Sequence, residues 1–132
     1  MKKILIDTNA YSRFLAGDEN VLNALAEAEI VYMSVFVIGE LYAGFRGGTK
    51  EQQNTDILKR FLKKPTVRVL NATRKTSEIF GKIKDNLKKA GTPLPINDVW
   101  IASHSIEKDA VIVTYDSHFK KIQGLDIWSH LF

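Results

Sequence analysis

The 132-residue sequence contains no cysteine, only three prolines and no long apolar run. The absence of cysteine excludes disulfide bonds, thiolate zinc sites and cysteine nucleophiles. The longest apolar stretch, from Ile30 to Ile38, is interrupted by Ser34 and is far shorter than the ~20 residues that span a bilayer. The start of the sequence also lacks the apolar region and cleavage site of a signal peptide. We therefore expect a cytoplasmic protein.

No repeat, linker or low-complexity tract divides the chain, so residues 1–132 are predicted to form a single domain. The content of hydrophobic residues, 45%, and of charged residues, 26%, is ordinary for a globular protein. There are 19 Lys and Arg against 15 Asp and Glu, a net charge of +4. This balance favours a polyanionic partner, but only weakly.

Short apolar segments alternate with amphipathic helical segments, a pattern typical of a parallel sheet with helices on both faces. Ser34 is predicted to cap a helix that runs through Phe45, and Asn97 to cap a helix that runs to about residue 108. A long amphipathic helix is expected over about 73–89. The predicted fold is a three-layer α/β/α arrangement around a central, mainly parallel five-stranded sheet. Its strands are expected at residues 4–6, 30–33, 67–70, 110–113 and 126–128.

Two of the predicted strands lead directly into an aspartate, and they lie at opposite ends of the sequence. Asp7 follows the first strand, and Asp116 comes shortly after the fourth. Open parallel sheets bind ligands beyond the carboxyl ends of their strands. Both aspartates are therefore expected at the functional edge of the sheet.

Glu40 and Asp98 are the other two acids that stand out. Glu40 falls on an apolar stripe of its predicted helix, where an unpaired carboxylate is costly to desolvate. Asp98 falls in the first turn of its helix, where the helix dipole favours an anion. Singly, the three aspartates have ordinary interpretations as caps, turn formers or dipole partners, whereas Glu40 would need a buried cation as partner. Together, four converging carboxylates would repel one another, and a bound Mg²⁺ or Mn²⁺ would resolve this.

Each of the four acids stands in a short motif: DTN at 7–9, VIGEL at 37–41, ND at 97–98 and TYD at 114–116. In this order and at this spacing, over essentially the whole chain, the motifs resemble those of the PIN-domain nucleases. The ending at 113–119, with Ile122 and Gly124 after it, is similar more narrowly to VapC-type toxins of toxin–antitoxin pairs.

The resemblance implies a PIN-like fold and a Mg²⁺-dependent endoribonuclease, with Mn²⁺ as a possible substitute, that serves as a toxin. It implies that Asp7 and Asp98 bind the metal directly and that Glu40 and Asp116 are further or water-mediated ligands. The cation would activate a water that hydrolyses the RNA phosphodiester. Polar residues that orient the acids are implied at Thr8, Asn9 and Thr114.

The resemblance also implies partners: an RNA substrate, a cognate antitoxin and a second copy of the chain in a homodimer. The antitoxin is expected to cover Tyr11, Phe14 and Leu15 on the helices after the first strand. Four basic residues near the acidic edge are the best candidates for contacts with RNA phosphates: Arg13, Arg46, Lys120 and Lys121.

Three other interpretations compete with a metal-dependent nuclease. The spacing of His104, His118 and His130 fits no zinc motif, and a structural role is favoured for all three. A phospho-receiver domain would need an acidic pair after the first strand, where this chain has Asp7 followed by Thr8 and Asn9. A non-catalytic RNA- or protein-binding module on the same fold remains open, although it predicts loss of the acids that are present here.

Overall fold

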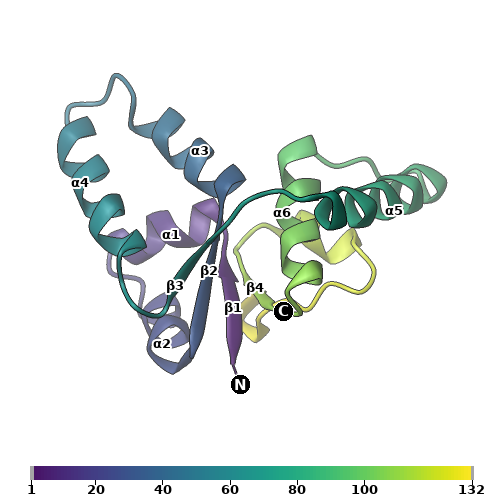
Figure 1. Cartoon of the computed structure of the whole chain (residues 1–132), viewed down its shortest axis with the longest axis horizontal. Coiled ribbons are helices and arrows are strands. Elements are labelled where there is room, and N and C mark those ends of the chain that lie inside the picture. Colours follow the sequence, from purple (N-terminus) through teal and green to yellow (C-terminus); the bar gives the residue numbers. More distant parts are fainter. Residues whose placement is uncertain (1, 132) are drawn as a thin grey trace.

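The computed structural model describes residues 2–131 and contains a parallel sheet with the strand order β3-β2-β1-β4 (Figure 1). The central strand β1 buries three consecutive side chains, with Ile4, Leu5 and Ile6 all at most 1% exposed. Consecutive burial means that both faces of the sheet are covered, as its unbroken apolar sequence predicts. The strands are β1 (Lys3–Ile6), β2 (Ile30–Ser34), β3 (Val67–Leu70) and β4 (Val111–Val113).

Helices flank the sheet on both sides, which confirms the predicted three-layer α/β fold. In Figure 1, α1 (Thr8–Leu15), α2 (Glu19–Glu27) and α4 (Glu51–Leu62) lie on one side, and α5 (Arg74–Ala90) and α6 (Ile96–Glu107) on the other. The helix α3 (Val35–Phe45) extends beyond the strand ends, and the chain closes with the short 3₁₀ helices η1 (Ser117–Lys121) and η2 (Ser129–Leu131). Between residues 2 and 131, no helix combines the length and apolar character needed to cross a membrane.

The predicted helix starts are right at two positions and wrong at one. The Ser34 hydroxyl caps α3 by accepting a hydrogen bond from the Phe36 amide at 3.1 Å, as predicted. Thr73 caps α5 through a reciprocal pair of hydrogen bonds with Thr76. Asn97 does not cap α6, because Pro95 occupies the cap position and the helix begins at Ile96. The Pro95 carbonyl accepts hydrogen bonds from the amides of Asp98 and Val99 at 3.1 and 3.3 Å, so the helical hydrogen bonds already begin two residues before Asn97.

The predicted fifth strand at 126–128 is wrong, and the sheet has four strands. Ile127 forms one isolated parallel bridge with Ile112 of β4. The Trp128 amide completes it by donating to the Ile112 carbonyl at 3.0 Å. The chain turns at Gly124, whose φ is +80°, and enters η2 just after the bridge, so too few residues are extended to form a strand.

The first helices after β1 contain both core and surface residues. Tyr11 is 0% exposed and packs edge-on against Phe61 of α4, with ring centroids 5.4 Å apart. The prediction that a partner would cover Tyr11 is therefore wrong, since the fold itself already buries this ring. Phe14 is only partly buried, and Leu15 is 39% exposed, so these two remain available to a partner.

Candidate metal centre

The two predicted strand-end aspartates lie at the same edge of the sheet, at the ends of neighbouring strands. Ile6 of β1 pairs with Val113 of β4, and the Asp7 amide donates to the Val113 carbonyl at 3.0 Å. Asp7 and Thr114 therefore follow the last paired residues of adjacent strands. Asp116 comes two residues later, at the start of η1.

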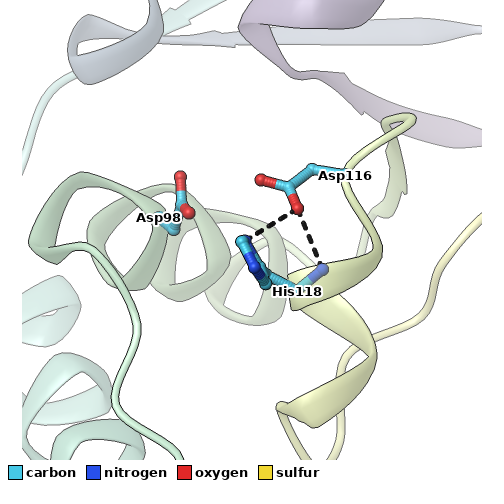
Figure 2. A group of neighbouring side chains, drawn as sticks. All are labelled: Asp98, Asp116 and His118. Carbon is cyan, nitrogen blue, oxygen red and sulfur yellow. Dashed lines mark hydrogen bonds and ion pairs between the residues drawn. The ribbon is translucent and has the colours of Figure 1, made fainter.

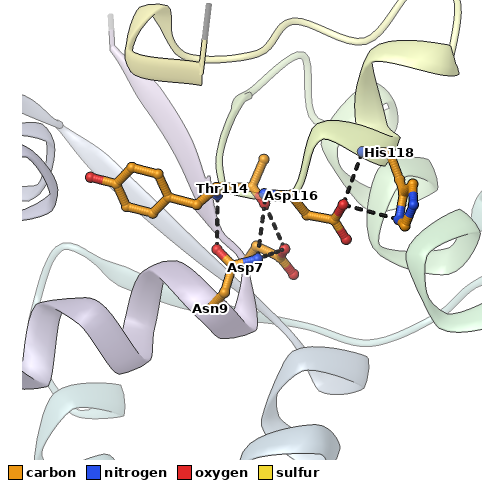
Figure 3. Close-up of polar contacts among 6 residues, drawn as sticks. Asp7, Asn9, Thr114, Asp116 and His118 are labelled. Carbon is orange, nitrogen blue, oxygen red and sulfur yellow. Dashed lines mark hydrogen bonds and ion pairs between the residues drawn. The ribbon is translucent and has the colours of Figure 1, made fainter.

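A network of hydrogen bonds holds the Asp7 carboxylate, which is only 4% exposed (Figure 3). Its Oδ2 atom accepts hydrogen bonds from the Thr114 hydroxyl at 2.8 Å and from the Asn9 side-chain amide at 3.2 Å. The Asn9 Oδ1 atom accepts from the Tyr115 backbone amide at 2.9 Å, and Thr114 Oγ1 accepts from the Asp116 amide at 3.0 Å. The segments after β1 and β4 are thus tied together by the side chains of Asn9 and Thr114.

Helix capping, an ordinary structural role for an aspartate, applies to one of the two strand-end acids and not to the other. Asp7 occupies the cap position of α1, yet its side chain makes no capping hydrogen bond. Asp116 does cap η1, because its Oδ1 atom accepts from the His118 amide at 2.9 Å. Capping therefore accounts for the placement of Asp116 but not for the burial of the Asp7 carboxylate.

Glu40 reaches the same edge of the sheet from α3 and has a neutral partner. Its Oε1 atom accepts a hydrogen bond from the hydroxyl of Thr8, the first residue of α1. Among residues 2–131, no lysine, arginine or histidine forms an ion pair with this half-buried carboxylate. A buried structural ion pair therefore does not explain Glu40.

Burial and mutual repulsion raise the pKa of two of the acids. Burial raises the pKa of Asp7 to about 6, against the effect of the Thr114 hydrogen bond, and the charges of Glu40 and Asp116 add to the rise. Burial, followed by the charges of the other three carboxylates, raises the pKa of Asp98 to about 6 as well, while His118 acts in the opposite direction. The four acids therefore form one electrostatic cluster, in which the charged forms of Asp7 and Asp98 are destabilised and a cation would stabilise them.

Asp98, Asp116 and His118 form the more open part of this cluster (Figure 2). Each offers one potential ligand atom, and these atoms all lie within 4.8 Å of one another. The His118 Nδ1 atom lies 3.1 Å from Asp116 Oδ1. Within residues 2–131, the Asp98 carboxylate accepts no hydrogen bond, so its oxygens are available to a ligand.

The placement of His118 beside Asp98 and Asp116 was not predicted from the sequence, which favoured a structural role for all three histidines. Its position two residues after Asp116 in a tight turn was the available signal. For His104 the structural interpretation is right, since its side chain is fully buried. Its ring nitrogens lie 2.9 Å from Ser34 Oγ and 3.2 Å from the Asn71 carbonyl oxygen.

The four basic residues predicted to bind RNA lie on different elements around the acids. Lys120 and Lys121 belong to η1, the same short helix as His118. The Arg13 guanidinium lies 4.2 Å from the centroid of the Tyr115 ring, beside the segment that leads to the acidic cluster. Arg46 follows the last turn of α3 and pairs with Glu51 at 3.5 Å.

The donor set defines the class of site. Carboxylate oxygens are the ligands that hard divalent cations such as Mg²⁺ and Mn²⁺ prefer. Here four carboxylates converge at the carboxyl edge of a parallel sheet, and the pKa values of Asp7 and Asp98 are raised. In the described part of the chain, no cationic side chain forms an ion pair with Glu40. The residues present therefore fit a divalent cation centre on an α/β fold.

Comparison with known proteins agrees with this class and identifies the family. The sequence model of the PIN domain matches residues 4–125, and the chain therefore belongs to the PIN-domain family. It is 29% identical over 126 residues to Ribonuclease VapC2 of Rickettsia felis, an alignment that covers 92% of each chain. It is 26% identical, with the same coverage, to Ribonuclease VapC1 of Haemophilus influenzae strain R2866. Membership of this family also decides against a phospho-receiver domain.

Solved structures show the same fold. The chain superposes on VapBC2 from Rickettsia felis, which was solved bound to a DNA fragment from its promoter, with a TM-score of 0.82 and 28% identity. That match covers 96% of this chain and 97% of the other. A match to VapBC-1 from nontypeable Haemophilus influenzae has a TM-score of 0.84 at 24% identity, covers 96% of each chain, and bears on the fold alone.

Proposed function

We propose that this chain is a metal-dependent endoribonuclease that hydrolyses RNA phosphodiester bonds. The observation that carries the proposal is the convergence of Asp7, Glu40, Asp98 and Asp116 at one edge of the sheet, where no cationic side chain within residues 2–131 forms an ion pair with Glu40. The ribonuclease names of relatives that align over 92% of the chain support RNA as the substrate. Either Mg²⁺ or Mn²⁺ fits this donor set.

The roles proposed for the residues follow from their surroundings. Asp7 and Asp98 would hold the cation directly, and Glu40 and Asp116 would hold it directly or through water. Bound there, a divalent cation would lower the pKa of a water and neutralise charge that develops on the phosphate. Three polar residues would keep the acids in place. Thr8 donates a hydrogen bond to the Glu40 carboxylate, and Asn9 and Thr114 each donate one to the Asp7 carboxylate.

RNA would reach the acids across a basic rim. Lys120 and Lys121 follow His118 in η1, and Arg13 is held beside the loop after β4 by the Tyr115 ring. Arg46, at the end of α3, would contact RNA further from the acids than the other three. Phosphate contacts of this kind supply affinity that falls as salt increases.

Cleavage of a labelled RNA by the purified chain tests the proposal. We expect cleavage with added Mg²⁺, none in excess chelator, and none by Asp98→Asn in either condition. Cleavage by Asp98→Asn that persists in saturating chelator would contradict the proposal and direct attention to the histidines. A non-catalytic binding module predicts RNA retention without cleavage by the wild-type chain in any metal.

We further propose that the chain is the toxin of a toxin–antitoxin pair. The solved relative from Rickettsia felis, 28% identical, is named VapBC2, and the chain has a surface that fits a partner segment. A groove of about 250 Å³ lies between the first helices, α4 and β3, and Leu22, which lines it, is 41% exposed. An antitoxin segment seated there would cover apolar surface and could reach the acids with a cationic side chain. The groove is lined by Phe14, Leu22, Leu25, Val31, Phe61 and Val67 among others.

Growth of cells that express the chain tests the toxin assignment. We expect the wild-type chain alone to arrest growth and Asp7→Asn to be harmless. Co-expression of the small protein encoded next to the gene should restore growth through a complex that survives purification. A chain that is harmless alone and binds no such protein would contradict the toxin assignment while leaving the nuclease proposal standing. Light scattering of the purified chain tests the proposed homodimer.

A further inference from the structure

The three histidines of the chain have different surroundings, and only one of them faces the acids. His104 is fully buried, with both ring nitrogens at hydrogen-bond distance from protein atoms. His130 is exposed and packs edge-on against Trp128, with ring centroids 5.0 Å apart. His118 has a side chain that is 54% exposed and lies against Asp116, within reach of Asp98 (Figure 2).

The backbone of η1 fixes His118 relative to Asp116. The His118 amide donates to Asp116 Oδ1 at 2.9 Å, and the imidazole Nδ1 atom lies 3.1 Å from the same oxygen. Neighbouring ligand atoms of an octahedral cation with bonds of ~2.1 Å are about 3.0 Å apart. The nitrogen and the oxygen are therefore spaced like two adjacent ligands of one ion.

An imidazole changes which cation a carboxylate site prefers. Carboxylates and water suit Mg²⁺, Ca²⁺ and Mn²⁺, whereas imidazole nitrogen suits transition metals and is a poor ligand for Mg²⁺. Unlike Mg²⁺, Mn²⁺ accepts both kinds of ligand, as Fe²⁺ and Zn²⁺ also do. A site with His118 beside Asp98 and Asp116 is thus better matched to Mn²⁺ than its carboxylates alone would be.

We propose that His118 supplies a nitrogen ligand to the cation held by Asp98 and Asp116 and so gives this chain a preference for Mn²⁺ over Mg²⁺. The inference rests on the metal site of the proposed function and concerns only the identity of the ion and of one ligand. It does not require that the imidazole take part in RNA cleavage.

Metal binding by the full-length chain, purified free of metal and measured at pH 7.5, tests this inference without an activity assay. The dissociation constants for Mn²⁺ and for Mg²⁺ would be compared among wild type, His118→Ala, His118→Gln and the matched control His130→Ala. Pulsed electron paramagnetic resonance of bound Mn²⁺ would detect the magnetic coupling of a coordinated imidazole nitrogen. His118→Gln retains a polar side chain that can still contact Asp116, but it lacks the imidazole.

We expect the nitrogen coupling in wild type and His130→Ala and its loss in both His118 variants. Those variants should bind Mn²⁺ at least about 10-fold more weakly, since even changes to the partners of metal ligands cost about 10- to 100-fold in affinity. Their affinity for Mg²⁺ should stay within about twofold of wild type. Wild type without nitrogen coupling, or His118→Gln with wild-type affinity for Mn²⁺, would overturn the inference.

The same measurements separate failure of this inference from failure of the proposed function. Mn²⁺ that binds without nitrogen coupling, and whose binding is lost in Asp98→Asn, would overturn the role of His118 and leave the carboxylate metal site intact. Binding of neither cation by wild type would overturn both.

Discussion

The two sides of the acidic cluster are built differently. On one side, Asp7 is 4% exposed and accepts hydrogen bonds from Thr114 and Asn9, so its position is fixed by the ends of two strands. On the other, Asp98 and Asp116 are only partly buried, and Asp98 accepts no hydrogen bond within residues 2–131. The first side has the character of a rigid support, and the second that of an open coordination site.

This difference indicates how the fold divides structural and chemical roles. Holding Asp7 costs desolvation, which the hydrogen bonds from Thr114 and Asn9 offset in part. Asp98, to which no group in residues 2–131 donates a hydrogen bond, costs less because the side chain is partly in water, and its oxygens stay available for a cation. Loss of a hydrogen bond that supports Asp7 should therefore lower stability, whereas loss of the Asp98 charge should not lower it in the absence of metal.

The largest effect is expected on the open side. Asp98→Asn should reduce Mg²⁺-dependent RNA cleavage by several orders of magnitude, because a cation in such a site supplies several kcal/mol of transition-state stabilisation. Its melting temperature without metal should equal or exceed that of wild type, since one repelling charge is removed. Cleavage assays and thermal unfolding check this, with Asp126→Asn, on the exposed surface, as the control. A variant that loses cleavage only because it unfolds would refute the proposed division.

The next effect is on the pH dependence of stability without metal. The pKa of Asp7 is raised to about 6, so the folded state binds more protons than the unfolded state between about pH 4 and 6. The free energy of unfolding should therefore fall as pH rises through that window, by at most about 3 kcal/mol for Asp7 and by less for the partly exposed Asp98.

Urea unfolding from pH 4.5 to 7.5 measures this dependence. Saturating Mg²⁺ should remove most of the loss at neutral pH, because the cation stabilises the charged carboxylates. Asp7→Asn should flatten the profile. The same pH profile in wild type and Asp7→Asn would show that the raised pKa of Asp7 does not contribute to the pH dependence of stability.

A smaller effect on stability is expected when a hydrogen bond that holds Asp7 is removed. Thr114→Val removes the hydroxyl that donates to Asp7 and accepts from the Asp116 amide, leaving both without that partner. The free energy of unfolding should fall by about 1–3 kcal/mol. Thr66→Val, on the exposed surface, is the control and should change it little. Equal stabilities of the two variants in urea titrations would mean that the hydrogen bonds around Asp7 do not support the fold.

The smallest effect on stability is expected at Glu40. Its partner is the Thr8 hydroxyl, which can donate equally well to the amide oxygen of a glutamine. Glu40→Gln should therefore change the free energy of unfolding by no more than about 0.5 kcal/mol, while weakening Mg²⁺ binding measured by calorimetry. A large fall in melting temperature with unchanged cleavage would restore a structural role for this acid.

The sequence predicted most of the fold because its strands are apolar over consecutive residues and its helices are amphipathic. It also predicted that Asp7 and Asp116 would share an edge, since parallel strands place their carboxyl ends together. The extent of the last strand could not be predicted, because Ile127 looks like a strand residue whether or not its neighbours pair.

The site could be predicted only in part, because several of its contacts join residues that are far apart in the sequence. The Thr8 hydrogen bond to Glu40 joins residues on separate helices, and no local pattern encodes it. The sequence favoured a structural role for His118, and its placement near Asp98, far away in the sequence, is what makes it a candidate ligand. The prediction that a partner would cover Tyr11 failed for the same reason, because the complete burial of this ring depends on Phe61 of α4.

The central claim is that the acidic cluster hydrolyses RNA with the help of a divalent cation. Mass spectrometry of the ends of RNA cleaved by the purified wild-type chain in Mg²⁺ tests it most directly. Attack by water predicts fragments with 5′-phosphate and 3′-hydroxyl ends, and no fragments in excess chelator. Fragments with 2′,3′-cyclic phosphate ends that still form in chelator would show that the neighbouring 2′-hydroxyl attacks without metal, and would contradict the account.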